Sequence, residues 1–180
     1  MTRIGLISDT HSFLDETVFE HFKNCDEIWH AGDFGNMDII KNLAAFKPLR
    51  GVYGNIDDAA IRSMYPEDLF FTCEEVNVFI RHIAGYPGRY ATGVKEKIIK
   101  NKSGLFISGH SHILKVMYDE KLHCLHMNPG AAGNQGWHKI KTIIRFNIDK
   151  KEMKNCEVIE LGERGAVGAE NKKDARRGAG

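Results

Sequence analysis

The stretch "RIGLISDTHS", residues 3–12, joins a short apolar run to an Asp-x-His triplet. The apolar run over residues 3–8 has the length and character of a buried strand. Asp9 and His11 follow it directly, and residues two apart in an extended segment point in the same direction. The stretch therefore predicts a strand whose carboxyl end carries two side chains that can reach one site.

The segments that follow alternate in type. They are a helix, a strand, a helix and a strand over residues 12–24, 27–31, 36–46 and 48–53. Ser12 and Asp15 have the spacing of a capping box, which predicts that the first helix begins there. Such alternation is typical of βαβ units, in which helices cover a sheet.

The second half of the chain is richer in strands. Strands are predicted over residues 68–74, 76–82, 104–109, 113–119, 122–128, 139–148 and 154–161, with one helix over 94–102. The residues thus predict an α/β (α+β) chain with two sheets, the second largely antiparallel, and helices outside. One domain is expected over residues 1–161, and residues 162–180 are expected to form a disordered tail because they lack periodicity.

Charge and composition exclude several function classes. The 180 residues include 25 basic and 24 acidic side chains, so the net charge of +1 gives no field to attract a nucleic-acid polymer. No apolar run approaches the length of a membrane span, and no signal peptide is recognised. The four cysteines are scattered, which predicts reduced thiols and a cytoplasmic location.

Polar side chains gather where the predicted strands end. They are Asp9, His11, Asp33, Asn55, His82, His110 and His112. Ligands of open α/β sheets bind outside the carboxyl ends of the strands, so these side chains are expected to face one crevice. Taken singly, Asp-x-His is common turn chemistry and "GHSH" fits a turn as well as a ligand pair, but their ordered recurrence favours a site.

The chemistry of these groups indicates metal binding. Histidine and carboxylate ligands without thiolates suit Mn, Fe, Ni or Zn better than Ca or Mg. Seven such groups exceed what one ion needs beside water. A site for two ions that share one carboxylate is the simplest interpretation.

The ordered set Asp-x-His, Gly-Asp, Gly-Asn, His, Gly-His-x-His resembles the pattern of the calcineurin-like metallophosphoesterases. The chain most resembles their small bacterial and archaeal branch, the YfcE-type phosphodiesterases, over residues 1–161. The resemblance implies a sandwich of two mixed β-sheets flanked by helices, the αββα arrangement.

The same resemblance implies roles for the residues. Asp9, His11 and His112 would hold one divalent ion, Asn55, His82 and His110 a second, and Asp33 would bridge them. Mn²⁺ is the first expectation for both ions, with Ni, Fe and Zn as alternatives. Asn55 would also orient a phosphoryl oxygen.

Two departures from the family pattern concern catalysis and substrate binding. Ile56 stands where many members carry a histidine, which leaves His11 and Asp57 as candidates for the general acid. The turn behind His82 is longer than usual, and its Tyr86 and Arg89 are expected to bind substrate.

The implied reaction is hydrolysis of a phosphate ester, most simply a phosphodiester, by a water or hydroxide activated between two ions. The expected substrate is a small molecule, without a nucleic-acid or membrane partner, and the oligomeric state is left open. The alternative is a non-enzymatic interaction scaffold of the same fold, like the retromer subunit. The complete set of seven coordinating side chains favours catalysis.

Overall fold

The strand that begins the chain, β1 (Thr2–Ile7), lies in the middle of a five-stranded sheet with the order β12-β11-β1-β2-β3. The computed structural model describes residues 1–165. The other strands of this sheet are β2 (Glu27–His30), β3 (Leu49–Gly51), β11 (Ile140–Asp149) and β12 (Glu152–Glu163). Strands β2 and β3 run parallel to β1, whereas β11 pairs with it antiparallel.

A second five-stranded sheet has the order β4-β5-β8-β10-β9. Its strands are β4 (Asp68–Cys73), β5 (Val76–Arg81), β8 (Leu105–Ile107), β9 (Leu114–Asp119) and β10 (Cys124–Pro129). The expectation of a largely antiparallel sheet is wrong, because β5, β8 and β10 are mutually parallel and only the edge strands are antiparallel. The last two strands of the chain join the first sheet instead.

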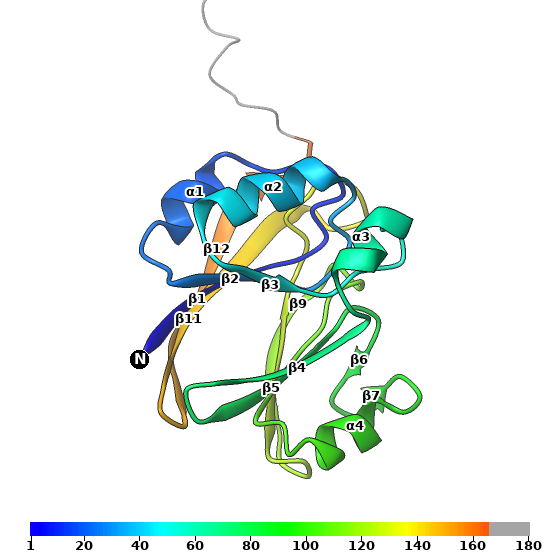
Figure 1. The fold of residues 1–180 in the computed structure, drawn as a ribbon, viewed down its shortest axis with the longest axis vertical. Coiled ribbons are helices and arrows are strands. Elements are labelled where there is room, and N and C mark those ends of the chain that lie inside the picture. Colours follow the sequence, from blue (N-terminus) through cyan, green and yellow to red (C-terminus); the bar gives the residue numbers. More distant parts are fainter. Residues whose placement is uncertain (166–180) are drawn as a thin grey trace, which may run out of the picture.

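Within residues 1–165, the four helices lie outside the sheets, as Figure 1 shows. They are α1 (Thr17–Phe22), α2 (Met37–Phe46), α3 (Ala59–Met64) and α4 (Val94–Lys100). Helices α1 and α2 pack on the first sheet, and α4 packs on the outer face of the second. The predicted arrangement of two mixed sheets flanked by helices is confirmed.

Helix α1 is shorter than the sequence predicts. It begins at Thr17, and the capping box of Ser12 with Asp15 does not form. The carboxylate of Asp15 instead accepts hydrogen bonds from the backbone and hydroxyl groups of Thr17 and from the ammonium of Lys141. Residues 12–16 therefore connect the loop of Asp9 and His11 to the helix.

The core lies between the two sheets. Ile4 and Leu6 point from β1 into this layer, where they meet Trp29, Ile107 and other fully buried side chains. Ile7 points to the opposite face and packs under α1 and α2. Because both faces of β1 are covered, its sequence is a continuous apolar run instead of an alternating one.

Helix α3, two short strands and the end of β12 fall where the sequence predicted no helix or strand. Strands β6 (Gly85–Tyr86) and β7 (Arg89–Tyr90) make a short hairpin behind His82. Strand β12 continues two residues past the predicted domain end at residue 161, since Gly162 and Glu163 still pair with β11. The remainder of the predicted tail, residues 166–180, lies outside the described residues. Within residues 1–165 no helix is long and apolar enough to cross a bilayer.

A buried ion pair links the loop after β1 to strand β11. The side chain of Lys141 is 1% exposed, and its Nζ lies 2.8 Å from Oδ2 of Asp15, which is 18% exposed. The ammonium also lies over the ring of Phe13. An ammonium removed from water in this way depends on its partners for compensation.

We expect Asp15→Asn to lower the free energy of unfolding by about 3 kcal/mol, because it leaves the ammonium of Lys141 buried without a counter-charge. Lys141→Met should cost less, since the carboxylate of Asp15 keeps access to water. Urea unfolding curves measure both. The exposed pairs of Lys154 with Asp149 and Glu152 provide the control, and Lys154→Met should change stability far less. Equal losses in all three variants would contradict the special role of the buried pair.

Candidate metal centre

All seven predicted ligands lie on loops at the carboxyl ends of strands. Loops after β1, β2, β3, β5 and β8 carry them, and these strands come from both sheets. Backbone hydrogen bonds between the first two loops extend the pairing of β1 with β2. Asp9 N–H donates to the carbonyl of Gly32 at 3.0 Å, and His11 N–H donates to that of Asp33 at 3.1 Å. These backbone bonds fix the spacing between the first two loops.

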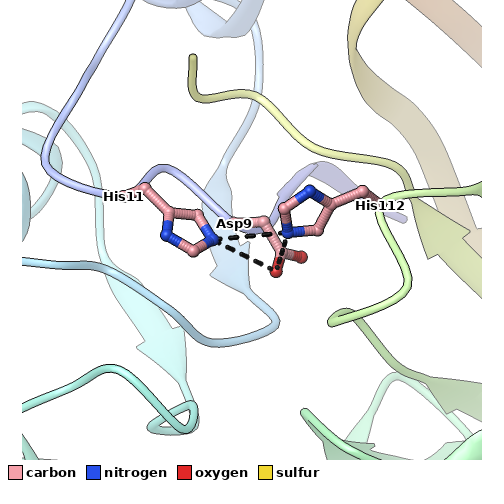
Figure 2. Close-up of side chains that lie close together, drawn as sticks. All are labelled: Asp9, His11 and His112. Carbon is pink, nitrogen blue, oxygen red and sulfur yellow. Dashed lines mark hydrogen bonds and ion pairs between the residues drawn. The ribbon is translucent and has the colours of Figure 1, made fainter. Parts of the chain in front are cut away.

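Three of the predicted ligands form a first group, which Figure 2 shows. Nε2 of His112 lies 3.1 Å from Oδ1 of Asp9, and Nε2 of His11 lies 3.3 Å from Nε2 of His112. The two imidazole rings meet edge to face. Three ligand atoms thus converge on one point between the loops after β1 and β8.

The second group consists of Asp33, His82 and His110, with Asn55 beside it. Nε2 of His82 lies 3.3 Å from Oδ2 of Asp33 and 3.2 Å from Oδ1 of Asn55. The same Oδ2 of Asp33 is 3.5 Å from Nε2 of His11 in the first group. Asp33 therefore stands between the groups, where one carboxylate oxygen faces both.

Each carboxylate is held by one oxygen and presents the other. Oδ2 of Asp9 accepts hydrogen bonds from the hydroxyl of Ser8 and the backbone N–H of His110. Oδ1 of Asp33 accepts from the backbone N–H of Ile56 at 3.0 Å. Within residues 1–165, Oδ1 of Asp9 is buried and accepts no hydrogen bond. An unsatisfied carboxylate oxygen in such a place is costly, and a cation would compensate it.

The orientation of His82 is also that of a metal ligand. Its Nδ1 lies 2.8 Å from the carbonyl oxygen of Ala31, so Nδ1–H donates there and Nε2 is the ring nitrogen directed at the centre. Metal-binding histidines commonly donate their second ring N–H to a carbonyl in this way. The unsatisfied Oδ1 of Asp9 and the orientation of His82 together show that these residues fit divalent metal ions.

Charge compensation within the two groups shifts the pKa values of their members. Burial alone would raise the pKa of Asp9, but the nearby imidazoles of His11, His112 and His82 hold its pKa well below the usual range. Asp33 is also buried, and the hydrogen bond from His82 lowers its pKa. Burial opposes protonation of His82, yet Asp33 and the charge of Asp9 raise its pKa. Both carboxylates thus stay ionised and attract a positive charge.

The backbone at the ligands is strained. Five of the seven adopt left-handed conformations, with φ of 52° at Asp9, 46° at His11, 58° at Asp33, 66° at His110 and 57° at His112. Non-glycine residues rarely adopt these angles, and such strain is concentrated at functional sites. The sharp turn directly after each strand directs the side chains of neighbouring loops toward one another.

Two glycines allow the backbone to approach the ligands closely. A Cβ on Gly54 would lie 2.0 Å from Oδ1 of Asp33. A Cβ on Gly136 would lie 2.0 Å from Nδ1 of His112, and Gly136 has a φ of +119°. The sequence analysis did not single out either glycine, although Gly54 directly precedes Asn55 in the recognised Gly-Asn motif.

Asp57, a predicted candidate for the general acid, has a different role in the structure. It is 3% exposed, and its two oxygens accept hydrogen bonds from the backbone N–H groups of Gly35 and Gly54, each at 2.8 Å. Both carboxylate oxygens are thus occupied by backbone donors within the protein. Asp57 therefore joins the loops after β2 and β3, and the structure does not support it as an acid.

The two predicted substrate residues are separated. Tyr86 lines a pocket of about 140 Å³ together with His110, and the ammonium of Lys115 lies 3.5 Å from the centre of its ring. Arg89 is exposed on the β6–β7 hairpin and does not line either of the pockets beside the predicted ligands. Only Tyr86 is placed beside a predicted ligand.

His30 lies beneath the centre and connects its first two loops. Its Nδ1 accepts from the backbone N–H of Gly32, its Nε2 lies 3.0 Å from the hydroxyl of Thr10, and its ring stacks on Phe34. Thr10, which the sequence analysis did not single out, donates in turn to backbone carbonyls of the second loop. Full burial lowers the pKa of His30 to about 3. His30 is therefore a neutral packing residue that also supports the ligands.

The sequence is similar to that of known proteins of one superfamily. The sequence model of the calcineurin-like phosphoesterase superfamily domain matches residues 2–151. A protein of Methanothermobacter thermautotrophicus named probable metallophosphoesterase is 32% identical over 136 residues, covering 71% of this chain and 76% of the relative. A protein of Methanocaldococcus jannaschii with the same description is 27% identical over 156 residues, covering 82% and 77%.

A solved structure shares the fold at lower identity. Vps29 from Entamoeba histolytica superposes with a TM-score of 0.71 over 89% of this chain and 99% of its own. The two sequences are 12% identical, so the likeness concerns the fold alone.

The low pKa of His30 predicts acid sensitivity of the metal-free protein. Below about pH 6.5 the unfolded chain binds a proton at His30. The folded chain binds that proton only below about pH 3, because the pKa of His30 is lowered by burial. The unfolded state then binds more protons, so the unfolding free energy falls as pH falls through this window, by up to about 1.4 kcal/mol per pH unit.

We expect His30→Gln to be less stable at pH 7 and to show a shallower decline toward pH 4. Urea unfolding in the presence of a chelator measures this slope. His21→Gln on α1 tests the effect of replacing a histidine outside the site. A slope in His30→Gln equal to that of the wild type would show that His30 is not kept neutral by the fold.

Proposed function

The chain belongs to the calcineurin-like phosphoesterase superfamily, and from this membership we propose that it hydrolyses small phosphate esters, phosphodiesters before monoesters, with two divalent metal ions. The observation that carries the proposal is the position of Asp33. One of its oxygens faces histidines of both groups, 3.5 Å from His11 and 3.3 Å from His82. A shared carboxylate is what a site for two ions requires.

We propose that Asp9, His11 and His112 hold one ion, and that Asn55, His82 and His110 hold the other with Asp33 between them. When bound, the ions would lower the pKa of water and offset negative charge on the phosphoryl oxygens. Mn²⁺ is the first candidate, because the nitrogen and oxygen donors suit it without thiolate, and Ni, Fe and Zn remain alternatives.

The chain's own residues would position the ester. With Oδ1 directed at His82, the amide nitrogen of Asn55 remains to donate to a phosphoryl oxygen. His11 directs Nε2 into the first group, where Asp9, Asp33 and His112 surround it. This geometry supports His11 as a ligand in preference to a general acid, so the departing oxygen would take its proton from solvent or depart as a stable anion.

The dimensions of the surroundings favour a small substrate. The Tyr86 pocket beside His110 encloses about 140 Å³, and a second cleft of about 340 Å³ lies beside Asn55 and His82. Two hollows, one lined by His110 and one by Asn55 and His82, offer space for the two arms of a phosphodiester. The net charge of +1 supports a substrate that is neither a nucleic-acid polymer nor an anionic membrane lipid. The scattered cysteines support action of the protein in the cytoplasm.

We expect the purified protein, cleared of metal by a chelator, to hydrolyse bis(p-nitrophenyl) phosphate only after Mn²⁺ is added. Asp33→Asn and His110→Ala should lower kcat/KM by at least about 100-fold, since each removes a ligand of the second ion. The release of p-nitrophenolate measures the rate, and calorimetric titration with Mn²⁺ measures metal binding independently of turnover.

His123→Ala is the matched control, because His123 is an exposed histidine on the turn before β10. It should keep both metal binding and activity. Full activity in Asp33→Asn, or hydrolysis that a chelator leaves unchanged, would refute the proposed site.

A protein-binding role is the second candidate, and a specific surface favours it. Edge strand β9 and the residue before it expose Ile113, Leu114, Val116 and Tyr118, and Trp137 on a neighbouring segment of the chain is 99% exposed. Exposed apolar side chains at a sheet edge are typical of interaction surfaces. Complete inertness toward mono- and diesters with Mn, Ni, Fe, Zn and Mg would favour this scaffold function over catalysis.

A further inference from the structure

Arg62 of helix α3 secures the loop that carries Asn55. Its Nε donates to the carbonyl oxygen of Asp57 at 2.7 Å, and its Nη2 donates to the carbonyls of Asn55 at 2.9 Å and Gly54 at 3.4 Å. The guanidinium also lies 4.9 Å from the ring centre of Tyr53. Three backbone acceptors and an aromatic face thus fix the plane of an exposed side chain next to the second ligand group.

The charge of this guanidinium is uncompensated. Among residues 1–165 no carboxylate lies within ion-pair distance of Arg62, and its Nη1 has no hydrogen-bond acceptor. The other arginine of the same cleft, Arg81, differs in both respects. It pairs with Asp68 at 2.7 Å and with Glu67. Arg62 is therefore the cation that this cleft offers to a ligand.

The cleft connects Arg62 to the reaction centre. Its volume is about 340 Å³, and Asn55 and His82 of the second ligand group belong to its lining. Tyr53, Ile83 and Ala91 form aromatic and aliphatic walls of the cleft. Arg62 also lines it. A molecule whose phosphate lies at Asn55 and His82 would extend one arm along these walls and past the free Nη1.

We propose that this cleft is a subsite for one arm of the substrate, and that Arg62 selects esters whose arm carries a second anionic group. The proposal rests on the proposed phosphoesterase function. A fixed guanidinium with free N–H donors recognises phosphate or carboxylate by charge-assisted hydrogen bonds, which are about twice as strong as neutral ones. The preferred substrates would then be esters with two anionic centres, one at the metal ligands and one at Arg62.

Two chromogenic diesters that differ by a single group test this. The first is thymidine 5′-(p-nitrophenyl phosphate), and the second is the same compound with a phosphate on the 3′ oxygen. We expect the wild type with Mn²⁺ to prefer the 3′-phosphorylated diester by about tenfold in kcat/KM. In Arg62→Gln the preference should fall to about one, and Arg62→Lys should keep part of it.

The ratio between the substrates separates recognition from support of the Asn55 loop. If Arg62 only holds the loop, Arg62→Gln will lower kcat/KM equally on both diesters, and the proposal is overturned. Lys100→Gln removes one exposed charge from α4 and should leave the ratio of kcat/KM between the two diesters unchanged. If the ratio falls as far in Lys100→Gln as in Arg62→Gln, the preference is an effect of net charge and the proposal is overturned. A wild type that hydrolyses both diesters equally refutes this inference alone, whereas one inert toward both refutes the proposed function.

Discussion

Two ionised carboxylates without access to water, Asp9 and Asp33, are the constraint that the surrounding structure satisfies. Asp9 is 0% exposed and Asp33 is 2% exposed, and an isolated carboxylate at such depth would be expelled or protonated. Each is retained because one oxygen is bound by backbone or hydroxyl donors and the other faces imidazole nitrogens. The loops must therefore hold their spacing closely, and the backbone bonds that join the first loop to the second do so.

The strained backbone at the ligands is tolerated because the apolar layers are formed independently of it. Left-handed conformations at non-glycine residues cost of the order of 1–3 kcal/mol each. Five adjoin strands β1, β2 and β8, whose side chains, such as Leu6, Trp29 and Ile107, are fully buried between the sheets. The order of the strands is thus set by the core, and the turns that follow can adopt the angles that the ligands need.

Most of the longer elements, and the gathering of the polar side chains at the strand ends, were predictable from sequence because both depend on local pattern. An apolar run ending in Asp-x-His identifies a strand and its functional end within ten residues, as at residues 3–12. Strand pairing is not local. Strand β11 pairs with β1 across more than 130 residues of chain, and nothing in its apolar run indicates which sheet receives it. The helix start failed for a related reason, since the partner that Asp15 takes in place of a cap is Lys141, on a distant strand.

Substrate recognition lies furthest from what sequence alone shows, and the two arginines near the centre illustrate why. Arg89 belongs to the unusual turn behind His82, from which a substrate role was predicted, yet it is exposed on the hairpin and lines neither pocket beside the predicted ligands. Arg62 belongs to an unremarked helix that the pattern did not reveal. Its importance arises from Tyr53 beneath it and from the carbonyls that orient it, which are features of a folded loop. Residue type and spacing identify groups that act on a shared ion, whereas selectivity for a substrate arm depends on which charge the fold leaves unpaired.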